Sequence, residues 1–543
     1  MPRDSDSDTD ISSRSGKVIV LREHQTAERV LDDLLSLDPT SIDFDQLLAR
    51  SALLGSPILA AVVRRLDAFH PGSLDVLGRV IAVYPDSREA AHTLRRIAND
   101  RRNTDRRRMG AVMILEQALG VQPPDDFLST LREPVHSATG LLMGAIDSNA
   151  DNPAALHDYL RALVFQPLDL LYSVLNLLSQ TPDDRTVDVL RLLAFQPDPD
   201  LQLGVIDALS NIGTPLAMRA LSLLELTLPD EPARAVGRTL QKLRLSGVEI
   251  EPLQRPAPDC RAWLSALDGR GDRLLWLVAP GPNSERALLG LLLNDLSGVV
   301  DALGNTAADP AGLPRRVPVG TLHDVLTFAV GAHSFDTTLG ETSSAYLEVP
   351  FNYALNLLRS AVALNWTTGT PLPVEYQLLN KIFWEYAGGI DESQTIFAPL
   401  DELAAQPSGE SESDLLFDPI FDSWYLDGPA VEAVAREIAT LDSGPPDEVN
   451  DESWRVLLPA LIRLAHDEFG PILRSRYAAR LWCMAEWLLI AGNTSGAALS
   501  AQSSRTLLKS PPEANLFVLR IVQKGILVAL AGIGDHRHDI KSH

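Results

Sequence analysis

The sequence predicts a mainly α-helical protein. An N-terminal superhelix of stacked helical hairpins precedes a small mixed α/β segment and a C-terminal helical region. Three observations predict this class. Leu and Ala, which favour helices, are abundant, while aromatic residues make up only 6% of the chain. From about residue 26, short amphipathic segments follow one another, separated by Pro, Gly and Asp. Near residue 250 this pattern stops at a Pro-rich joint.

The length of 543 residues exceeds what one compact core usually needs, so we expect several structural units. The first 15 residues are rich in Ser and Asp and poor in apolar side chains, which is typical of disorder. On these grounds the chain divides into a disordered acidic N-terminus (1–25), a helical solenoid (26–250), a mixed segment with a β-hairpin and helices (251–390), an acidic loop-rich connector (391–450) and a C-terminal helical region (451–543).

The predicted solenoid contains an internal repeat. Phe165–Pro167 recurs as Phe195–Pro197 after 30 residues, and each copy lies between two apolar helical segments. After the second copy, Asp198 and Pro199 form a typical helix start, because Asp caps free N–H groups and Pro suits the first turn. One side of the helix that follows is apolar through Leu201, Val205, Ala208 and Leu209. A single hairpin cannot bury such a face, so we expect neighbouring hairpins to stack.

The stretch Asp198–Gly213, followed by Thr214–Leu221, resembles a HEAT repeat of the short bacterial type, which includes the repeats of phycobilin-lyase-like proteins. The resemblance is clearest over about 180–247 and extends back to about residue 50. It implies an α-α superhelix of the ARM type that serves as a binding scaffold. It also implies an alternative, a lyase-like protein that handles a chromophore or another cofactor.

Beyond the joint, the apolar runs 273–278 and 286–293 predict two strands joined by a turn at 280–283, since Gly and Pro flank both runs. A buried helix remains the alternative for runs of this length. Helices are expected again over 351–365 and 373–386. The strongest C-terminal helix spans Tyr477–Ala491 and ends at Gly492 and Asn493.

Charge limits the classes of partner. The chain carries 47 basic and 72 acidic residues, for a net charge of -25, and residues 391–470 hold 19 Asp and Glu against 3 Lys and Arg. Such a chain repels phosphate backbones and anionic lipid, so nucleic acid is an unlikely partner and a membrane is not expected. Leu516–Gly534, the most apolar run, is interrupted by Arg520 and Lys524 and predicts an amphipathic helix. Together with an acidic N-terminus and only two, widely spaced cysteines, this predicts a cytoplasmic protein.

A basic cluster interrupts the acidic sequence. It consists of Arg95, Arg96, Arg101, Arg102, Arg106, Arg107 and Arg108. Counted with Asp100 and Asp105, it has a net charge of +5 over 14 residues. Such a cluster is often only a solvated surface. As a binding site it would suit an acidic protein, the chain's own acidic stretch or a nucleic acid.

Other polar and aromatic groups are better explained by structure than by chemistry. Carboxylates near the predicted hairpin are typical turn residues: Asp268, Asp272, Asp295 and Asp301. A His-x-His pair, His536 and His538, lies with His543 in the last residues of the chain. The aromatic residues have the helical spacing of a core: Trp366, Tyr376, Phe383, Trp384, Tyr386, Trp482 and Trp487.

The sequence contains no phosphate-binding loop, dinucleotide motif, nucleophile elbow or kinase signature. We therefore expect no catalytic residue, metal or cofactor. The leading hypothesis is a non-catalytic protein-interaction scaffold, or a regulatory protein, that binds another protein on the solenoid surface. The alternatives are the cofactor-handling protein and a nucleic-acid binder acting through the basic cluster Arg95–Arg108.

Overall fold

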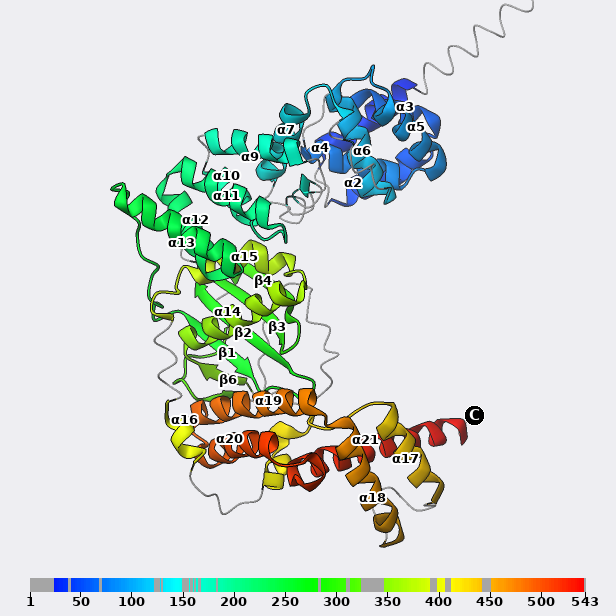
Figure 1. The fold of residues 1–543 in the computed structure, drawn as a ribbon. Coiled ribbons are helices and arrows are strands. Elements are labelled where there is room, and N and C mark those ends of the chain that lie inside the picture. The colour runs from blue at the N-terminus through cyan, green and yellow to red at the C-terminus, as the bar shows by residue number, and fades with distance from the viewer. Residues whose placement is uncertain are drawn as a thin grey trace, which may run out of the picture. The chain divides into compact units, whose positions relative to one another are not determined.

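Figure 1 shows the protein as a computed structural model. The residues that the structure describes are 24–37, 41–67, 71–121, 127, 130–148, 156, 160, 163–164, 168–181, 184–281, 285–308, 313–323, 346–390, 398–405, 412–441 and 451–541. The contacts between residues divide the chain into two compact units, Met1–Ala217 and Met218–His543. Most of the predicted disordered terminus and the first repeat copy, Phe165–Pro167, lie outside the described residues.

The described part of the first unit is helical. After a helical stretch over residues 24–36, its helices are α2 (Ile42–Ala52), α3 (Ser56–Arg65), α4 (Pro71–Ala82), α5 (Ser87–Asn99), α6 (Asp105–Leu119), α7 (Pro134–Ser148), α9 (Leu168–Gln180), α10 (Arg185–Leu193) and α11 (Pro199–Ile212). The starts of α5, α6 and α11 are capped by the side chains of Asp86, Thr104 and Asp198. The predicted start at Asp198 and Pro199 is therefore confirmed.

Neighbouring helices of the first unit pack against one another. Helix α6 contacts α5 and α4, and α9 contacts α10 and α11. The predicted apolar side of α11 is buried, with Leu201, Val205 and Leu209 fully inaccessible. Gly204 lets α11 approach α9 closely, because an added Cβ would lie 3.1 Å from the Tyr172 ring. The mainly helical fold is confirmed, while a continuous superhelix stays a prediction.

The second unit begins within a helix and continues into a sheet. Two helices, α12 (Pro215–Thr227) and α13 (Asp230–Leu245), precede the Pro-rich joint. The sheet is antiparallel, with the order β4-β3-β2-β1-β6-β5. Its strands are β1 (Arg261–Ser265), β2 (Asp272–Pro280), β3 (Arg286–Asn294), β4 (Gly298–Ala308), β5 (Leu322–His323) and β6 (Tyr346–Val349). The two predicted strands correspond to β2 and β3, and the sheet extends well beyond that hairpin.

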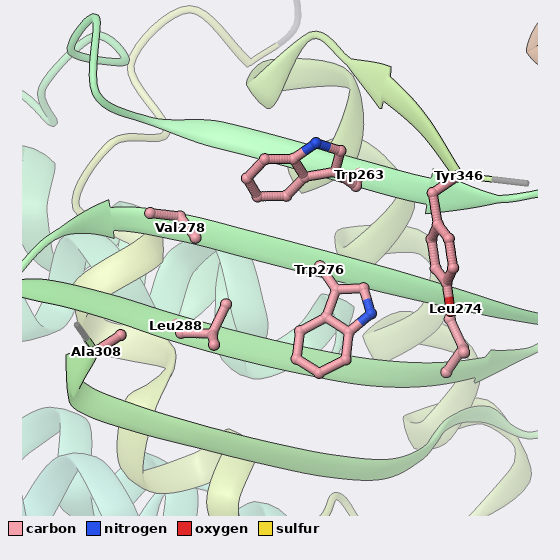
Figure 2. Close-up of a cluster of buried hydrophobic side chains, with 7 residues drawn as sticks. All are labelled: Trp263, Leu274, Trp276, Val278, Leu288, Ala308 and Tyr346. Atoms are coloured by element: carbon pink, nitrogen blue, oxygen red, sulfur yellow. The ribbon is translucent and has the colours of Figure 1, made fainter. Parts of the chain in front are cut away.

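The two faces of the sheet differ. Helices α14 (Phe351–Thr368) and α15 (Val374–Trp384) pack against it, and Leu379 of α15 lies over Gly304 of β4. Strand register places Trp263 of β1 opposite Trp276 of β2. Figure 2 shows these two rings in one buried cluster with Tyr346 of β6.

The rest of the second unit is helical again. Its elements are α16 (Ala398–Leu403), the 3₁₀ helices η5 (Glu412–Phe417) and η6 (Pro419–Phe421), α17 (Pro429–Leu441), α18 (Asp451–Glu468), α19 (Pro471–Ile490), α20 (Thr494–Lys509), η7 (Pro512–Ala514) and α21 (Leu516–Lys541). Helices α19 and α20 lie side by side (Figure 1). The contacts that join α19 to the sheet and its turns include the Trp487 indole, which donates to the Leu264 carbonyl, and Arg480, which pairs with Asp295.

Among the described residues, α21 is the one helix long and apolar enough to cross a membrane by length and composition, over Leu516–Ile533. Helices α2 and α3 meet the same test only when counted together, and they are bent by 116°. In α21, Phe517, Val518 and Ile521 are fully buried inside the protein. The first half of this helix is therefore a core element, as the amphipathic pattern predicts.

Candidate interaction surface

The arginines of the basic cluster lie at the end of α5, in the connection to α6 and in the first turn of α6. The structure separates them into two groups. Arg107 and Arg108 make defined contacts inside the first unit, whereas Arg95, Arg96, Arg101, Arg102 and Arg106 are exposed. The cluster is therefore not a single site.

Arg108 is a structural residue. Its side chain is 2% exposed and lies over the Phe127 ring. The guanidinium donates to the carbonyl of Ala98 at 2.7 Å and to the carbonyl and hydroxyl oxygens of Thr130 at 3.0 and 2.8 Å. Burial lowers the pKa of Arg108, although Asp105 opposes the shift. This arginine joins α6 to the end of α5 and to the segment before α7.

Arg107 is engaged nearby. Its guanidinium pairs with Asp67 at 3.3 Å, and Asp67 also accepts a hydrogen bond from the Thr104 hydroxyl. The same hydroxyl accepts the backbone N–H of Arg107 and so caps α6. These contacts hold the start of α6 against the end of α3, where Asp67 follows the helix. Arg107 is thus committed to a local contact.

The side chains of Arg95, Arg96, Arg101 and Arg102 make no hydrogen bond or ion pair with any described residue. Arg106 is exposed as well and has a partner. Free guanidinium groups are pre-organised donors that can bind carboxylates or phosphates with two parallel hydrogen bonds. These four residues are the part of the cluster that is exposed and has no partner among the described residues.

Two further basic residues of α5 lie on the same side of the helix as Arg95 and Arg96, and the sequence pattern was not used to predict them. Arg88 and His92 are exposed and precede Arg95 and Arg96 with helical spacing. The opposite side of α5 is apolar and buried through Ala90, Leu94, Ile97 and Ala98. The spacing i, i+4, i+7 in the sequence was a signal that could have revealed the extended stripe. Arg88 likewise has no partner among the described residues, so we define the basic surface as Arg88, Arg95, Arg96, Arg101 and Arg102.

The acidic neighbours of the basic surface form hydrogen bonds with other groups of the first unit. The Glu89 carboxylate accepts a hydrogen bond from the Tyr84 hydroxyl at 2.7 Å. Asp100 binds the backbone N–H of Arg102, and Asp105 binds the backbone N–H groups of Arg132 and Glu133. Each carboxylate therefore has a structural hydrogen bond. These carboxylates thus do not occupy the guanidinium donors of the basic surface.

Two of the carboxylates near the hairpin, Asp268 and Asp272, bind groups of the adjoining turns. Asp268 accepts the backbone N–H groups of Arg270 and Asp272, and burial raises the pKa of Asp268. The Asp272 carboxylate accepts the Asn294 amide at 2.7 Å. Asp295 holds the buried Arg480 through two bonds of 2.6 and 2.9 Å. Asp301 is exposed. In the described part of the chain, no three His, Cys, Asp or Glu residues are placed to hold a metal ion.

The other candidates are placed as follows. His536 and His538 lie in α21, where the structure describes the backbone only, and His543 is outside the described residues. Most of the aromatic residues are buried, namely Tyr376, Phe383, Trp384, Tyr386 and Trp487. Trp366 donates its indole N–H to the Thr227 carbonyl of α12, and Trp482 is half-buried. The aromatic set thus packs the interior.

A buried polar cluster that the sequence did not reveal lies between α14, α19 and β2. The Tyr353 hydroxyl donates to the Glu486 carboxylate at 3.1 Å, with Arg273 and the Cys483 thiol nearby. Burial raises the pKa of Tyr353, Cys483 and Glu486, and Arg273 opposes each shift. The Tyr353–Glu486 hydrogen bond joins α14 to α19, so the cluster suits a structural contact between α19 and the rest of the unit.

Comparisons with models of known protein families, with curated protein sequences and with solved structures find no significant match to this chain.

Proposed function

We propose that this protein is a non-catalytic scaffold of the cytoplasm that binds an acidic segment of another protein on its basic surface. The observation that carries the proposal is the set of five exposed guanidiniums on α5 and in the connection to α6, which have no partner among the described residues. Isolated surface charges usually find counter-ions in solvent, but three arginines on one face of α5 and two in the connection that follows create a local field of opposite sign to the chain. Such a field steers acidic partners to this site.

An acidic protein segment fits this surface better than a nucleic acid does. A carboxylate carries one charge and is received by one arginine fork, so a few carboxylates are matched by a few arginines. A nucleic acid presents a continuous row of phosphates, and its approach is opposed by the net charge of -25 that the whole chain carries. The acidic protein segment is therefore the partner class that we propose.

The resemblance of the first unit to HEAT repeats supports a binding role for this unit. Stacked helical hairpins expose much surface per residue and present it on a rigid framework. Three features of the first unit agree with such stacking: sequential helix contacts, Asp-capped helix starts and the buried apolar side of α11. The basic surface would then be an outward face of one hairpin, α5 and α6.

The test compares two double charge reversals of equal size. Arg96→Glu with Arg102→Glu changes the basic surface, and Arg238→Glu with Lys242→Glu changes exposed residues of α13. The probes are a fluorescent glutamate-rich peptide and a fluorescent single-stranded oligonucleotide of equal charge, titrated by anisotropy at several salt concentrations. We expect the first variant to weaken peptide binding about tenfold or more, because each reversal replaces an attraction with a repulsion.

The control reversal on α13 should leave peptide binding within about twofold of the original protein. Circular dichroism of both variants checks that the helices remain folded. Equal binding by the original protein and the Arg96/Arg102 variant would overturn the proposal. So would tighter binding of the oligonucleotide than of the peptide, which would instead support the nucleic-acid alternative.

A further inference from the structure

The second half of α21 has an apolar face that lies open among the described residues. Leu527 and Val528 are 38% and 44% exposed, and Ala531 and Gly532 are exposed as well. Of the apolar window Leu516–Ile533, only 33% is buried inside the protein. Apolar residues gathered on an exposed face mark a surface that another molecule covers.

The opposite side of α21 anchors the helix to the second unit. Helices α17 and α18 and the 3₁₀ helix η5 contact α21 (Figure 1). The Ile521 carbonyl accepts the backbone N–H of Leu426 at 3.2 Å. Gly525 lies so close to the Leu426 carbonyl that an added Cβ would clash with it. The exposed face is therefore carried on a helix that the rest of the unit holds in place.

The exposed face of α21 has an ordered sequence of charges. Residues three and four positions apart lie on one side of a helix, here within an arc of about 100°. The exposed side carries basic residues in its first part, small apolar residues in the middle and acidic residues in its last part. In chain order these are Arg520, Lys524, Val528, Ala531, Asp535 and Asp539. Asp535 and Asp539 are placed by the helix backbone, which is what the structure describes there.

The two basic residues of this face retain hydrogen-bond donors. Arg520 donates one hydrogen bond, to the Gln523 side chain at 2.8 Å. Lys524 donates to the Phe421 carbonyl at 2.8 Å and lies 3.5 Å from the Asp422 carboxylate. A guanidinium has five N–H donors and an ammonium has three. Both groups can therefore accept a further carboxylate as a partner.

The charge order makes the face complementary to itself. When two copies of α21 lie antiparallel with Lys524 opposite Asp535, Arg520 falls opposite Asp539, because the two pairs have the same midpoint in the sequence. The same register brings the small apolar residues of the two centres together. A parallel arrangement would instead place like charges against each other, which is unfavourable. The sequence of the face thus specifies both a partner and an orientation.

We propose that the protein forms a homodimer in which two copies of α21 pack antiparallel through this face. The contact is about 30 Å long, as the helical rise over this stretch gives. One helix pair is a small interface, so we expect a dissociation constant of about 10 µM. The inference is independent of the proposed scaffold function, because α21 and the basic surface belong to different units.

Sedimentation velocity of the full chain between about 1 and 100 µM tests the proposal. We expect a reversible monomer–dimer equilibrium that salt weakens. Arg520→Glu with Lys524→Glu makes the face wholly acidic, and Asp535→Lys with Asp539→Lys makes it wholly basic. Each double variant should dimerise at least about tenfold more weakly than the original protein. An equimolar mixture of the two should dimerise again, because opposite charges face each other once more in the mixed pair.

A matched pair of variants tests the apolar centre. Ala531→Glu buries two carboxylates in the proposed contact and should weaken dimerisation at least about tenfold. Ala479→Glu, an equal change at an exposed position of α19, should leave dimerisation within about twofold. Circular dichroism checks that each variant is folded. Because Lys524 also binds the Phe421 carbonyl, the acidic variant can lose stability, and the basic variant then decides together with Ala531→Glu.

Three outcomes would overturn the proposal. The first is a protein that stays monomeric at about 100 µM. The second is dimerisation that neither the basic variant nor Ala531→Glu weakens. The third is that the two folded charge variants do not associate when they are mixed. A monomer that instead sediments with phosphatidylcholine vesicles would also overturn it and would assign the face to a lipid surface.

Discussion

At the scale of single residues, arginine has three roles that depend on its surroundings. Arg108 and Arg480 are buried and donate to backbone carbonyls. Arg261 forms two bonds to the buried Glu348 and stacks over Trp263. Arg102 is exposed, and its side chain has no partner in the part of the chain that the structure describes. The sequence could predict the cluster Arg95–Arg108 but not the role of each member, because burial depends on helix packing that local spacing does not encode.

Replacing Arg108 with Ala should lower the free energy of unfolding by about 3 kcal/mol, because it removes three charged hydrogen bonds and leaves the Ala98 and Thr130 carbonyls buried without donors. Arg102→Ala, the control on the surface, should change it by less than about 0.5 kcal/mol. Urea unfolding followed by circular dichroism measures both. A similar, small loss for the two variants would contradict the structural role of Arg108.

Glu486 should make stability depend on pH. Burial raises the pKa of this carboxyl in the folded state above its ordinary value, so the folded protein binds more protons than the unfolded chain between the two pKa values. The free energy of unfolding therefore falls as pH rises through that interval. Glu486→Gln removes the titration, and the variant should gain stability relative to the original protein as pH rises. Unfolding curves at a series of pH values would show this, and a difference independent of pH would contradict it.

At the scale of elements, the hairpin β2–β3 could be predicted because both strands are long, apolar and bounded by Gly and Pro. The strands β1, β5 and β6 could not. Strand β1 is five residues long, β6 is four and β5 is two, too short for a periodic signal. The 3.6-residue period remains visible in long helices: the predicted C-terminal helix corresponds to α19, followed by Gly492 at a φ of 78°.

Gly290 is a position in the sheet where a larger side chain would not fit. It lies opposite Trp276, and a Cβ there would lie 2.5 Å from the indole ring. Gly290→Ala should therefore displace the buried ring and lower the free energy of unfolding by about 2 kcal/mol. The tryptophan emission should shift as well. The same change combined with Trp276→Leu should cost less than the sum of the two single changes. Simple additivity would contradict the steric explanation.

At the scale of the whole molecule, a mainly helical chain could be predicted from composition and periodicity. The boundary between the two units, however, does not lie at the Pro-rich joint. The contacts place the boundary between Ala217 and Met218, inside α12. Helix α12 then belongs with the sheet, as the Trp366 hydrogen bond to Thr227 shows. The amphipathic pattern of a helix shows that it has a buried face but does not identify the neighbour that covers it.

The boundary predicts how fragments behave. A fragment spanning 214–543 retains all of α12 and should unfold cooperatively on heating. A fragment spanning 251–543 starts at the joint and loses the contacts of Arg219 and Thr227. We expect it to melt several degrees lower, or to aggregate, because the groups facing α12 and α13 become exposed. Calorimetry of the two fragments measures the difference. Equal melting temperatures would show that α12 and α13 are dispensable to the second unit.

The strand order has a consequence for the time course of synthesis on the ribosome. Strands β1 to β4 form a meander of consecutive antiparallel neighbours, whereas β6 pairs with β1 only after about 80 intervening residues. Local pairing is rapid and distant pairing is slow, so a nascent chain exposes the open edge of β1 until Tyr346 and the residues after it have been translated. An unpaired edge recruits strands from other chains. Slow translation of this interval should therefore favour mispaired oligomers, and holdase chaperones are expected to bind the chain there.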